Sequence, residues 1–237
     1  MEEKLSGIVL GGISYGENDK ILNVFTLEKG VISAKIKGVK KAGAKLKFAS
    51  EPFCFAEYIL THGKAGYTVI NASLIESFYS LREDIFKFYA GATVLDFVKH
   101  FYRENIVSPE TFLSVVSALK EIAYGKDTKT ALVKFLIYAI KAAGYALETH
   151  GCLRCGEMKT GRVFFDYIVG GFYCEECYDG NGREINPETF FAVKTIEEGG
   201  EITDEQGVKA LRLIDYYLDN KAEESLRSLK ELLKILP

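Results

Sequence analysis

Four of the five cysteines in the sequence form two Cys-x-x-Cys pairs, Cys152 with Cys155 and Cys174 with Cys177. Eighteen residues separate the two pairs, which is a spacing typical of tetrahedral zinc sites. Two residues between cysteines allow both sulfurs to reach one ion about 2.3 Å away, and the second pair completes the tetrahedron. Because four thiolates leave no open coordination position, the pattern predicts one structural zinc ion (Zn2+) per chain and no metal-activated water.

The residues around the cysteines are consistent with this prediction. Gly156 follows the first pair and Gly170-Gly171 precedes the second, so the chain can turn at both places. His150 could in principle replace one thiolate, but four cysteines already suffice. Two disulfide bonds are one alternative, although nothing in the sequence indicates secretion. A thioredoxin-like redox pair is another, but it does not explain two matched pairs at this spacing.

The sequence also contains a cluster of basic residues. The stretch from Lys29 to Ala49 contains seven lysines and no acidic residue, whereas the whole chain has a net charge of −3. A basic stripe on an acidic protein indicates a surface for a polyanion, and lysine contacts with phosphates give affinity that depends on salt and little on sequence. The alternative is a solvated lysine face that only aids solubility. The lysines of the stretch are Lys29, Lys35, Lys37, Lys40, Lys41, Lys45 and Lys47.

Sequence signatures of enzymes are absent. The chain contains no Gly-x-x-x-x-Gly-Lys-Ser/Thr loop, no Gly-x-Gly-x-x-Gly, no His-Glu-x-x-His and no Gly-x-Ser-x-Gly. None of its three histidines belongs to an acid–nucleophile arrangement that the sequence can justify, and Cys54 lies among apolar residues, as expected for a buried thiol. We therefore expect that the protein is not an enzyme.

The composition is that of a globular protein with two or three modules. The chain has 237 residues, of which 48% are hydrophobic and 27% are charged. No run of about 18 apolar residues is present, so no membrane span is expected. The start of the chain, Met1-Glu2-Glu3-Lys4, is unlike a signal peptide. Together with the reduced thiols that a zinc site requires, this favours the cytoplasm.

Residues 5–76 have the pattern of short β-strands separated by turns. Apolar and polar residues alternate from Val31 to Gly38, and turn-forming residues occupy 15–19, 28–30 and 62–66. Further strands are expected over 51–60, entered through Pro52, and over 67–75. Five short antiparallel strands favour a small closed barrel of the oligonucleotide-binding (OB) type, although a barrel of the SH3 type would give nearly the same pattern.

Residues 82–144 change to helical periodicity. A first helix is expected over 84–103. A second begins with Ser108 as its N-cap and Pro109 in its first position, and a third begins at Asp127 and ends at Gly144. Three helices with short connections predict a bundle.

Three more helices are expected after the cysteines. Asn186-Pro187 begins one, Thr203 or Asp204 begins another, and a leucine-rich segment from Leu226 forms the last. We expect them to return to the bundle, so that the zinc module is an insertion between helices. The fold class is therefore α+β and multidomain.

Several motifs resemble, in their order and spacing, those of the RecO family of bacterial recombination mediators and DNA-repair proteins over essentially the full chain. The N-terminal ones are Gly7-Ile8-Val9-Leu10, Tyr15-Gly16-Glu17-Asn18-Asp19-Lys20-Ile21-Leu22, Phe25-Thr26-Leu27-Glu28-Lys29-Gly30, Lys37-Gly38-Val39-Lys40-Lys41 and Glu51-Pro52-Phe53. The later ones are Ser80-Leu81-Arg82-Glu83-Asp84, Cys152-Leu153-Arg154-Cys155-Gly156, Phe165-Asp166, Gly170-Gly171 and Cys174-Glu175-Glu176-Cys177.

The resemblance implies a DNA-binding OB-fold barrel, a helical domain and an inserted four-cysteine zinc finger. It implies binding of single- and double-stranded DNA without sequence specificity, annealing of complementary strands and, with RecR, loading of RecA onto strands coated by single-strand-binding protein. The helical domain would hold the acidic, apolar C-terminal tail of that coating protein, for which Lys129, Lys134 and Lys141 are possible partners. Such a protein would work in the cytoplasm, at the nucleoid.

The candidate DNA-binding residues are Lys20, Lys35, Lys37, Lys40, Lys41, Lys45 and Lys47. The family often has arginine in this stretch, and lysine keeps the charge but loses bidentate phosphate geometry. The expected domains are 1–80 (OB fold), 81–150 (helical), 151–183 (zinc finger) and 184–237 (C-terminal helices). Two other functions fit the same residues: a scaffold that binds only proteins, and an RNA-binding OB-fold protein.

Overall fold

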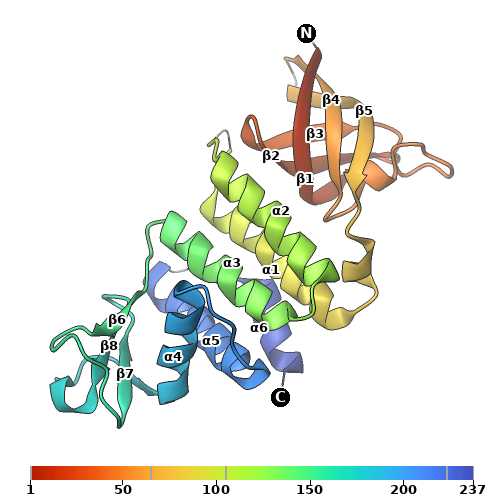
Figure 1. Cartoon of the computed structure of the whole chain (residues 1–237). Helices are drawn as coiled ribbons and strands as arrows, with labels where there is room; N and C mark the ends of the chain where they lie inside the picture. The colour runs from red at the N-terminus through yellow and green to blue at the C-terminus, as the bar shows by residue number, and fades with distance from the viewer. Residues whose placement is uncertain (1, 65, 105, 223, 237) are drawn as a thin grey trace.

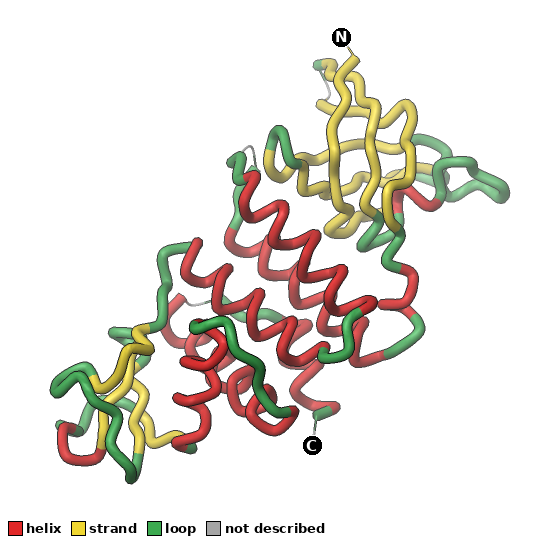
Figure 2. The backbone as a smooth tube through the Cα atoms, in the orientation of Figure 1, coloured by secondary structure: helices red, strands yellow, loops and turns green. Residues whose placement is uncertain are grey.

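The computed structural model describes residues 2–64, 66–104, 106–222 and 224–236. A β-barrel formed by the N-terminal part of the chain is followed by a layer of helices, and a small sheet lies at the opposite end of the molecule (Figure 1, Figure 2). The helices separate the barrel from the small sheet, so the molecule is elongated. This architecture confirms the predicted α+β fold with an OB-like barrel, a helical part and a four-cysteine module.

Five strands close the barrel in the order β1-β2-β3-β5-β4. Every neighbouring pair is antiparallel except β3 with β5, which run parallel, whereas the sequence had led us to expect antiparallel pairs throughout. The strands are β1 (Glu2–Tyr15), β2 (Asp19–Thr26), β3 (Gly30–Ile36), β4 (Phe55–Gly63) and β5 (Gly66–Glu76).

The long strand β1 belongs to both sides of the barrel. Its first half pairs with β4 and its second half with β2, and the register shifts between Val9 and Gly11, where the strand bends. Gly12 follows the bend, and a Cβ atom there would lie 2.9 Å from the backbone oxygen of Ile21. The Gly11-Gly12 pair therefore lets β1 curl closely against β2, which closes the barrel.

In the part of the chain that the structure describes, six α-helices follow the barrel, and most of the predicted caps are present. The Asp84 and Asp127 side chains accept hydrogen bonds from the backbone N–H groups of Lys87 and Thr130, at 2.9 and 3.0 Å. Ser108 is an exception, because its hydroxyl donates to the Thr111 hydroxyl and accepts no hydrogen bond from a backbone N–H group of the helix. The helices are α1 (Ile85–Phe101), α2 (Pro109–Tyr124), α3 (Thr128–Ala142), α4 (Pro187–Glu197), α5 (Asp204–Tyr217) and α6 (Arg227–Ile235).

The strand predicted to open at Glu51 begins later. A 3-10 turn at Phe48–Ser50 precedes it, and Phe53 has a φ of 69°, a left-handed conformation that a strand does not accommodate. Phe53 is buried, and its ring packs edge-on against Phe88 of α1 with centroids 5.8 Å apart. Packing against the helices thus overrides the local strand pattern, and β4 starts at Phe55.

Apolar residues form two buried clusters. One fills the barrel, and the other runs from the outer face of the barrel through the helices to the small sheet. Phe25 of β2 joins barrel to helices by packing on Phe112 of α2, with ring centroids 5.5 Å apart. In the described part of the chain, no helix combines the length and the apolarity needed to cross a membrane.

Candidate metal centre and nucleic-acid interface

The four predicted cysteine ligands come together at one point. The Sγ atoms of Cys152, Cys155, Cys174 and Cys177 all lie within 4.8 Å of one another. The Sγ atoms of Cys155 and Cys174 are 3.8 Å apart, which is far longer than a disulfide bond. A tetrahedron of thiolates with metal–sulfur bonds of roughly 2.3 Å has an edge of about 3.8 Å, so the four sulfurs fit a single metal ion. His150 lies outside the cluster, with its side chain 96% exposed.

The backbone around the first pair supports thiolate ligands. Burial opposes ionisation of Cys152, but backbone N–H groups of Cys155, Cys174 and Arg154 outweigh it and lower the pKa of Cys152 to about 6. Thiolates, not thiols, bind metals. Gly156 has a φ of 82°, as its predicted turn requires, and its carbonyl oxygen would lie 2.0 Å from a Cβ atom on Gly151. Glycine at both positions lets the chain fold tightly around the ligands.

A four-stranded sheet supports the metal centre, and its strands were not predicted. The order is β6-β8-β7-β9, and only β6 with β8 is parallel. The Phe172 ring of β8 packs on Phe190 of α4 at 5.0 Å, which fixes the sheet to the C-terminal helices. The strands are β6 (Glu148–Cys152), β7 (Val163–Asp166), β8 (Gly171–Cys174) and β9 (Arg183–Ile185).

At the other end of the molecule, the candidate lysines gather where β2 begins and β3 ends. Lys20 is the Cα partner of Ile36, so these two strand ends are neighbours. The loop 37–47 continues from β3 and folds back against the β1–β2 turn, where the Lys40 N–H donates to the Asn18 carbonyl at 3.0 Å. Seven lysines that are spread over 28 sequence positions, 20 to 47, therefore lie at one end of the barrel.

Two of the seven lysines are paired with carboxylates. Lys35 Nζ lies 3.0 Å from Asp19 Oδ2, and Lys20 Nζ lies 3.5 Å from Glu51 Oε1. Asp19 also accepts the Gly38 N–H at 2.8 Å, and this bond, followed by Lys35, lowers the pKa of the carboxyl group. Asp19 thus fixes the start of the loop to β2 and neutralises the charge of Lys35, one of the predicted DNA-binding residues.

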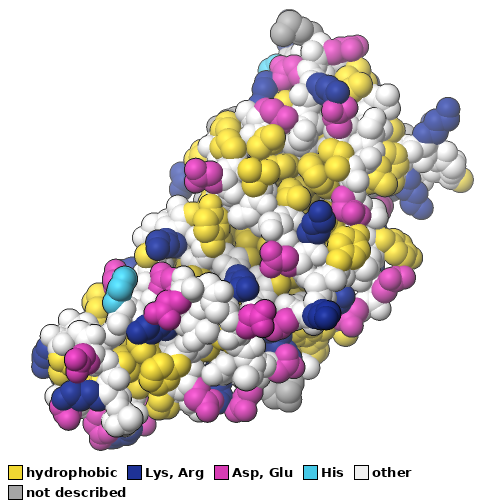
Figure 3. Space-filling view, in the orientation of Figure 1, with side chains coloured by type: hydrophobic (Ala, Val, Ile, Leu, Met, Phe, Trp, Pro, Cys, Tyr) yellow, Lys and Arg dark blue, Asp and Glu magenta, His cyan; other side chains and the backbone are white. Residues whose placement is uncertain are grey.

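The other five lysines are exposed and make no ion pair with a carboxylate among the residues that the structure describes; they are Lys37, Lys40, Lys41, Lys45 and Lys47. Four of them lie on the loop 37–47 beyond Gly38, which projects from the barrel in Figure 1 and carries dark-blue side chains in Figure 3. Successive tight turns, such as Ala44 N–H to Lys41 carbonyl at 3.2 Å, give the loop a defined path. We call these four, Lys40, Lys41, Lys45 and Lys47, the lysine loop.

A cavity of about 630 Å3 opens on the outer face of β2 and β3, next to Lys35. Tyr15 at the end of β1 and Tyr67 at the start of β5 both line it. This cavity could not be predicted from the sequence, because its walls come from all five strands of the barrel and from Glu104 beyond α1. In OB folds the face of strands 2 and 3 is where oligonucleotides bind.

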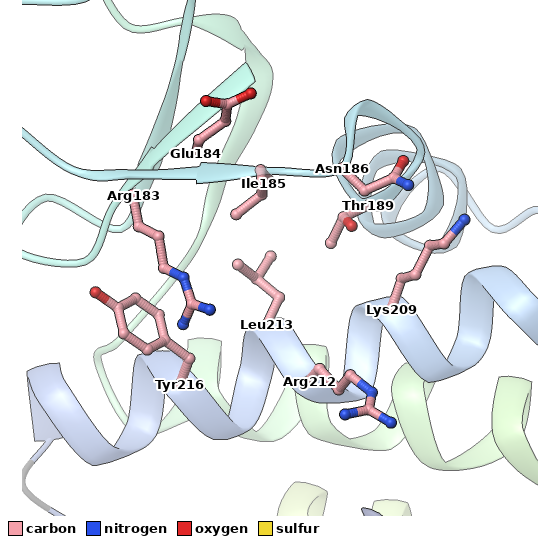
Figure 4. A pocket seen from close by; sticks show the side chains of 9 residues that line it. All are labelled: Arg183, Glu184, Ile185, Asn186, Thr189, Lys209, Arg212, Leu213 and Tyr216. Carbon is pink, nitrogen blue, oxygen red and sulfur yellow. The ribbon is translucent and has the colours of Figure 1, made fainter. Parts of the chain in front are cut away.

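A second cavity, of about 250 Å3, lies between β9 and α5 (Figure 4). The Arg183 guanidinium lies over the Tyr216 ring, 5.2 Å from its centroid, and Ile185 and Leu213 supply apolar walls. The possible partners Lys129 and Lys141 lie elsewhere on α3, and they pair with Asp204 and, at 3.6 Å, with Glu197.

The sequence was compared with protein families and with curated proteins. Residues 1–78 match the family model described as "Recombination protein O N terminal", and residues 82–230 match "Recombination protein O C terminal". The DNA repair protein RecO of Acetivibrio thermocellus is 30% identical over 179 residues, which cover 75% of this chain and 71% of that protein. The DNA repair protein RecO of Clostridium novyi is 26% identical over 239 residues, 96% of this chain and 92% of that protein.

The DNA repair protein RecO of Caldicellulosiruptor saccharolyticus is 28% identical over 185 residues, covering 78% of this chain and 76% of that protein. The two family models divide the chain as the structure does, into the barrel and the part that carries the helices and the four cysteines. With an OB-like barrel, a helical part and a metal-binding cluster in that order, the chain belongs to the RecO family.

Proposed function

We propose that this chain mediates recombinational DNA repair by binding single- and double-stranded DNA without sequence specificity and by annealing complementary strands. The observation that carries the proposal is the lysine loop, whose four ammonium groups project from an OB-like barrel with no carboxylate paired to them in the described residues. Lys20, Lys35 and Lys37 lie at the base of the loop. Lys37 adds a cation without an ion pair among the described residues, whereas Lys20 and Lys35 would contact DNA after leaving Glu51 and Asp19.

The mechanism requires only electrostatics. Lysine side chains displace the counterions that surround a DNA strand, and the release of these ions supplies the binding free energy. Two strands whose phosphates are neutralised by lysines can approach each other, and base pairing then drives annealing. No nucleotide hydrolysis enters this scheme, which is consistent with the expectation that the protein is not an enzyme.

The metal of the four-cysteine cluster is proposed to be Zn2+. Four sulfur ligands in tetrahedral arrangement are typical of zinc or of iron. Zinc accounts better for a site that is closed by four ligands and built into a packed sheet, because such sites are structural. Its role would be to fix residues 152–177 and to hold the small sheet against α4 and α5.

The partners expected for a recombination mediator are RecR, RecA indirectly, and single-strand-binding protein, at the nucleoid in the cytoplasm. For the acidic, apolar tail of single-strand-binding protein, the cavity at β9 and α5 is the better candidate, because Arg183 and apolar residues line it. We propose the domains 1–80, 81–150, 151–183 and 184–237; the cavity then lies at the last boundary, with Arg183 on one side and Tyr216 on the other.

The proposal is tested with a variant in which Lys40, Lys41, Lys45 and Lys47 are replaced by glutamate. We measure binding to a short labelled oligonucleotide by fluorescence anisotropy at several salt concentrations. Each lysine that contacts a phosphate adds about 0.7 to the slope of log K against log salt for single strands. We expect the variant to lose affinity at every salt concentration and to lose about 3 units of slope.

The matched control carries glutamate at Lys120, Lys126, Lys134 and Lys141, which lie on α2, α3 and their connection. It has the same net charge as the first variant and should bind DNA like the unmodified chain. Equal DNA affinity and equal slope in the unmodified chain and the lysine-loop variant would contradict the proposal. A flat salt dependence in all three proteins is the result expected for a scaffold that binds only proteins.

A further inference from the structure

The cavity on the outer face of β2 and β3 differs chemically from the lysine loop beside it. Ile21 and Val31 contribute apolar side chains to its lining, and Tyr15 and Tyr67 contribute aromatic rings. Its volume of about 630 Å3 lies within the range of small-molecule sites, roughly 300–1,000 Å3. The only ammonium group in its lining, that of Lys35, is already paired with Asp19. The cavity is therefore suited to a flat, largely apolar group more than to a phosphate.

The two tyrosine rings are held in place by neighbouring cations. Lys35 Nζ lies 4.4 Å from the centroid of the Tyr15 ring. Lys29 Nζ donates to the Tyr67 hydroxyl at 3.1 Å and is itself paired with Glu3. The His62 ring lies 4.5 Å from the Tyr67 ring on the side of the β4–β5 turn. Rings whose rotation is already restricted lose little entropy when a ligand stacks on them.

The negative charge of Glu104, in the lining of the cavity, also favours bases over phosphates there. Glu104 lines the cavity through the bridge that its backbone forms with Val31, and it makes no ion pair with a described residue. A carboxylate repels phosphate but accepts hydrogen bonds from the N–H groups of bases, including N3–H of thymine. Phosphates are therefore favoured at the lysine loop, and bases are favoured in the cavity.

We infer that this cavity binds bases of single-stranded DNA, which stack on Tyr15 and Tyr67 while the lysine loop holds the phosphates. The inference rests on the proposed DNA binding and adds a preference to it. Bases of a duplex are paired and stacked inside the helix, so they cannot enter the cavity. The tyrosines should therefore contribute to binding of single strands only, whereas the lysines contribute to binding of both forms.

The test uses the full chain with Tyr15→Leu and Tyr67→Leu combined, and three DNA probes: an oligothymidylate, an abasic strand of the same length, and a duplex. Stacking on one aromatic side chain contributes about tenfold to affinity. We expect the double variant to bind oligothymidylate at least tenfold more weakly and to bind the abasic strand and the duplex as the unmodified chain does. The control Tyr138→Leu, on exposed α3 surface, should leave all three affinities unchanged.

A second measurement does not depend on the stability of the double variant. The chain contains no tryptophan, so Tyr15→Trp introduces a single indole at the cavity. Its fluorescence should be quenched by oligothymidylate and not by the abasic strand. Equal quenching by both strands, or equal loss of affinity for both strands in the leucine variant, would overturn the inference. The lysine-loop variant tests the proposed function separately. If the lysines bind phosphates, this variant should bind the abasic strand more weakly, whether or not bases stack on the tyrosines.

Discussion

Asp96 of α1 caps the N-terminus of α6 by binding Ser228, which lies 132 positions later in the chain. The Asp96 carboxylate accepts the backbone N–H of Ser228 at 3.1 Å and also the Ser228 hydroxyl. Helix α6 begins after Leu226, whose side chain cannot serve as a cap. The carboxylate from α1 therefore satisfies a backbone donor and faces the positive end of the helix dipole. Lys99, 3.0 Å away, completes the arrangement.

Replacing Asp96 by asparagine should lower the free energy of unfolding at neutral pH by about 1.5–3 kcal/mol, the contribution of a hydrogen bond to a charged group. Burial raises the pKa of Asp96, but the bonds from Ser228 and Lys99 outweigh burial and lower it below its ordinary value. The stabilisation is thus present above the pKa of the unfolded state and is lost as the pH falls through the lower folded value. Urea unfolding at several pH values measures the difference.

The matched control is Lys99→Ala, which removes only an exposed ion pair and should cost less than about 1 kcal/mol. If Asp96→Asn destabilised the protein equally at all pH values, the charge of the carboxylate would not be the cause.

Asp215 of α5 should have the opposite effect on stability. Burial, followed by the Asp219 carboxylate, raises the pKa of Asp215 to about 6, against the opposing charge of Lys230. The folded state then holds a proton that the unfolded state has released, so stability falls as the pH rises from about 4 to 6. Asp215→Asn should increase stability at pH above 7 by about 1–2 kcal/mol, allowing for the part of the side chain that remains exposed.

This gain should disappear below the unfolded pKa of the aspartate, and a thermal unfolding series against pH would detect the change. Glu201→Gln, at an exposed carboxylate, serves as control and should shift the midpoint little at any pH. A gain from Asp215→Asn that persisted at acid pH would argue for improved packing in place of charge removal.

Removal of two metal ligands should affect stability before DNA binding. In Cys152→Ser/Cys155→Ser, we expect the metal content of purified protein to fall from one zinc per chain to none. Structural zinc contributes on the order of 10 kcal/mol to folding of small modules, so residues 152–177 should become sensitive to protease. The salt dependence of DNA binding should stay unchanged, because the lysine loop lies at the far end of the molecule (Figure 1).

Cys54→Ala is the control for loss of a thiol, since Cys54 is buried in the barrel, where burial raises its pKa to about 11. It should retain its full metal content. Unmodified, reduced protein that contained no zinc by elemental analysis would exclude the assigned metal.

The seven candidate lysines should differ in their contributions to DNA binding. Lys20 and Lys35 must give up Glu51 and Asp19 to contact a phosphate, whereas Lys45 and Lys47 have no such partner among the described residues. On an abasic strand, Lys45→Ala/Lys47→Ala should therefore lower the salt slope by about 1.4, and Lys20→Ala/Lys35→Ala by clearly less. Equal changes would show that the ion pairs open without cost when DNA binds.

Much of the barrel and of the helices could be predicted because the signals are local. The turn at Gly30 has a φ of 68°, and Asp127 and Asn186 cap the backbone at the predicted starts of α3 and α4. Each of these features is set by residues within a few positions of one another. The spacing of the cysteines likewise predicted their convergence.

Features that depend on distant parts of the chain could not be predicted in the same way. The strand at Glu51 was misplaced because Phe53 packs on α1, and nothing in the local alternation reports that contact. The pairing of β3 with β5, the pairing of β6 with β8 and the cavity also arise only when distant segments meet. Two of the predicted lysines are paired with carboxylates, Lys20 with Glu51 and Lys35 with Asp19. Asp19 is next to Lys20 in the sequence, yet it binds Lys35 on the neighbouring strand.

The barrel of this protein depends on the helices that pack against it. The outer face of β1 and β2 carries Ile8, Leu10 and Phe25, which are buried against the helices. The carbonyl oxygen of Ile106, beyond α1, sits so close to Gly30 that a methyl group there would lie 2.1 Å from it. A fragment ending near residue 80 would keep every candidate lysine, but it would expose this apolar surface to water. It would also lose Glu104 from the lining of the cavity on β2 and β3. Truncation would thus leave the candidate lysines and both tyrosines of the cavity in place, but it would remove the helices that cover the barrel.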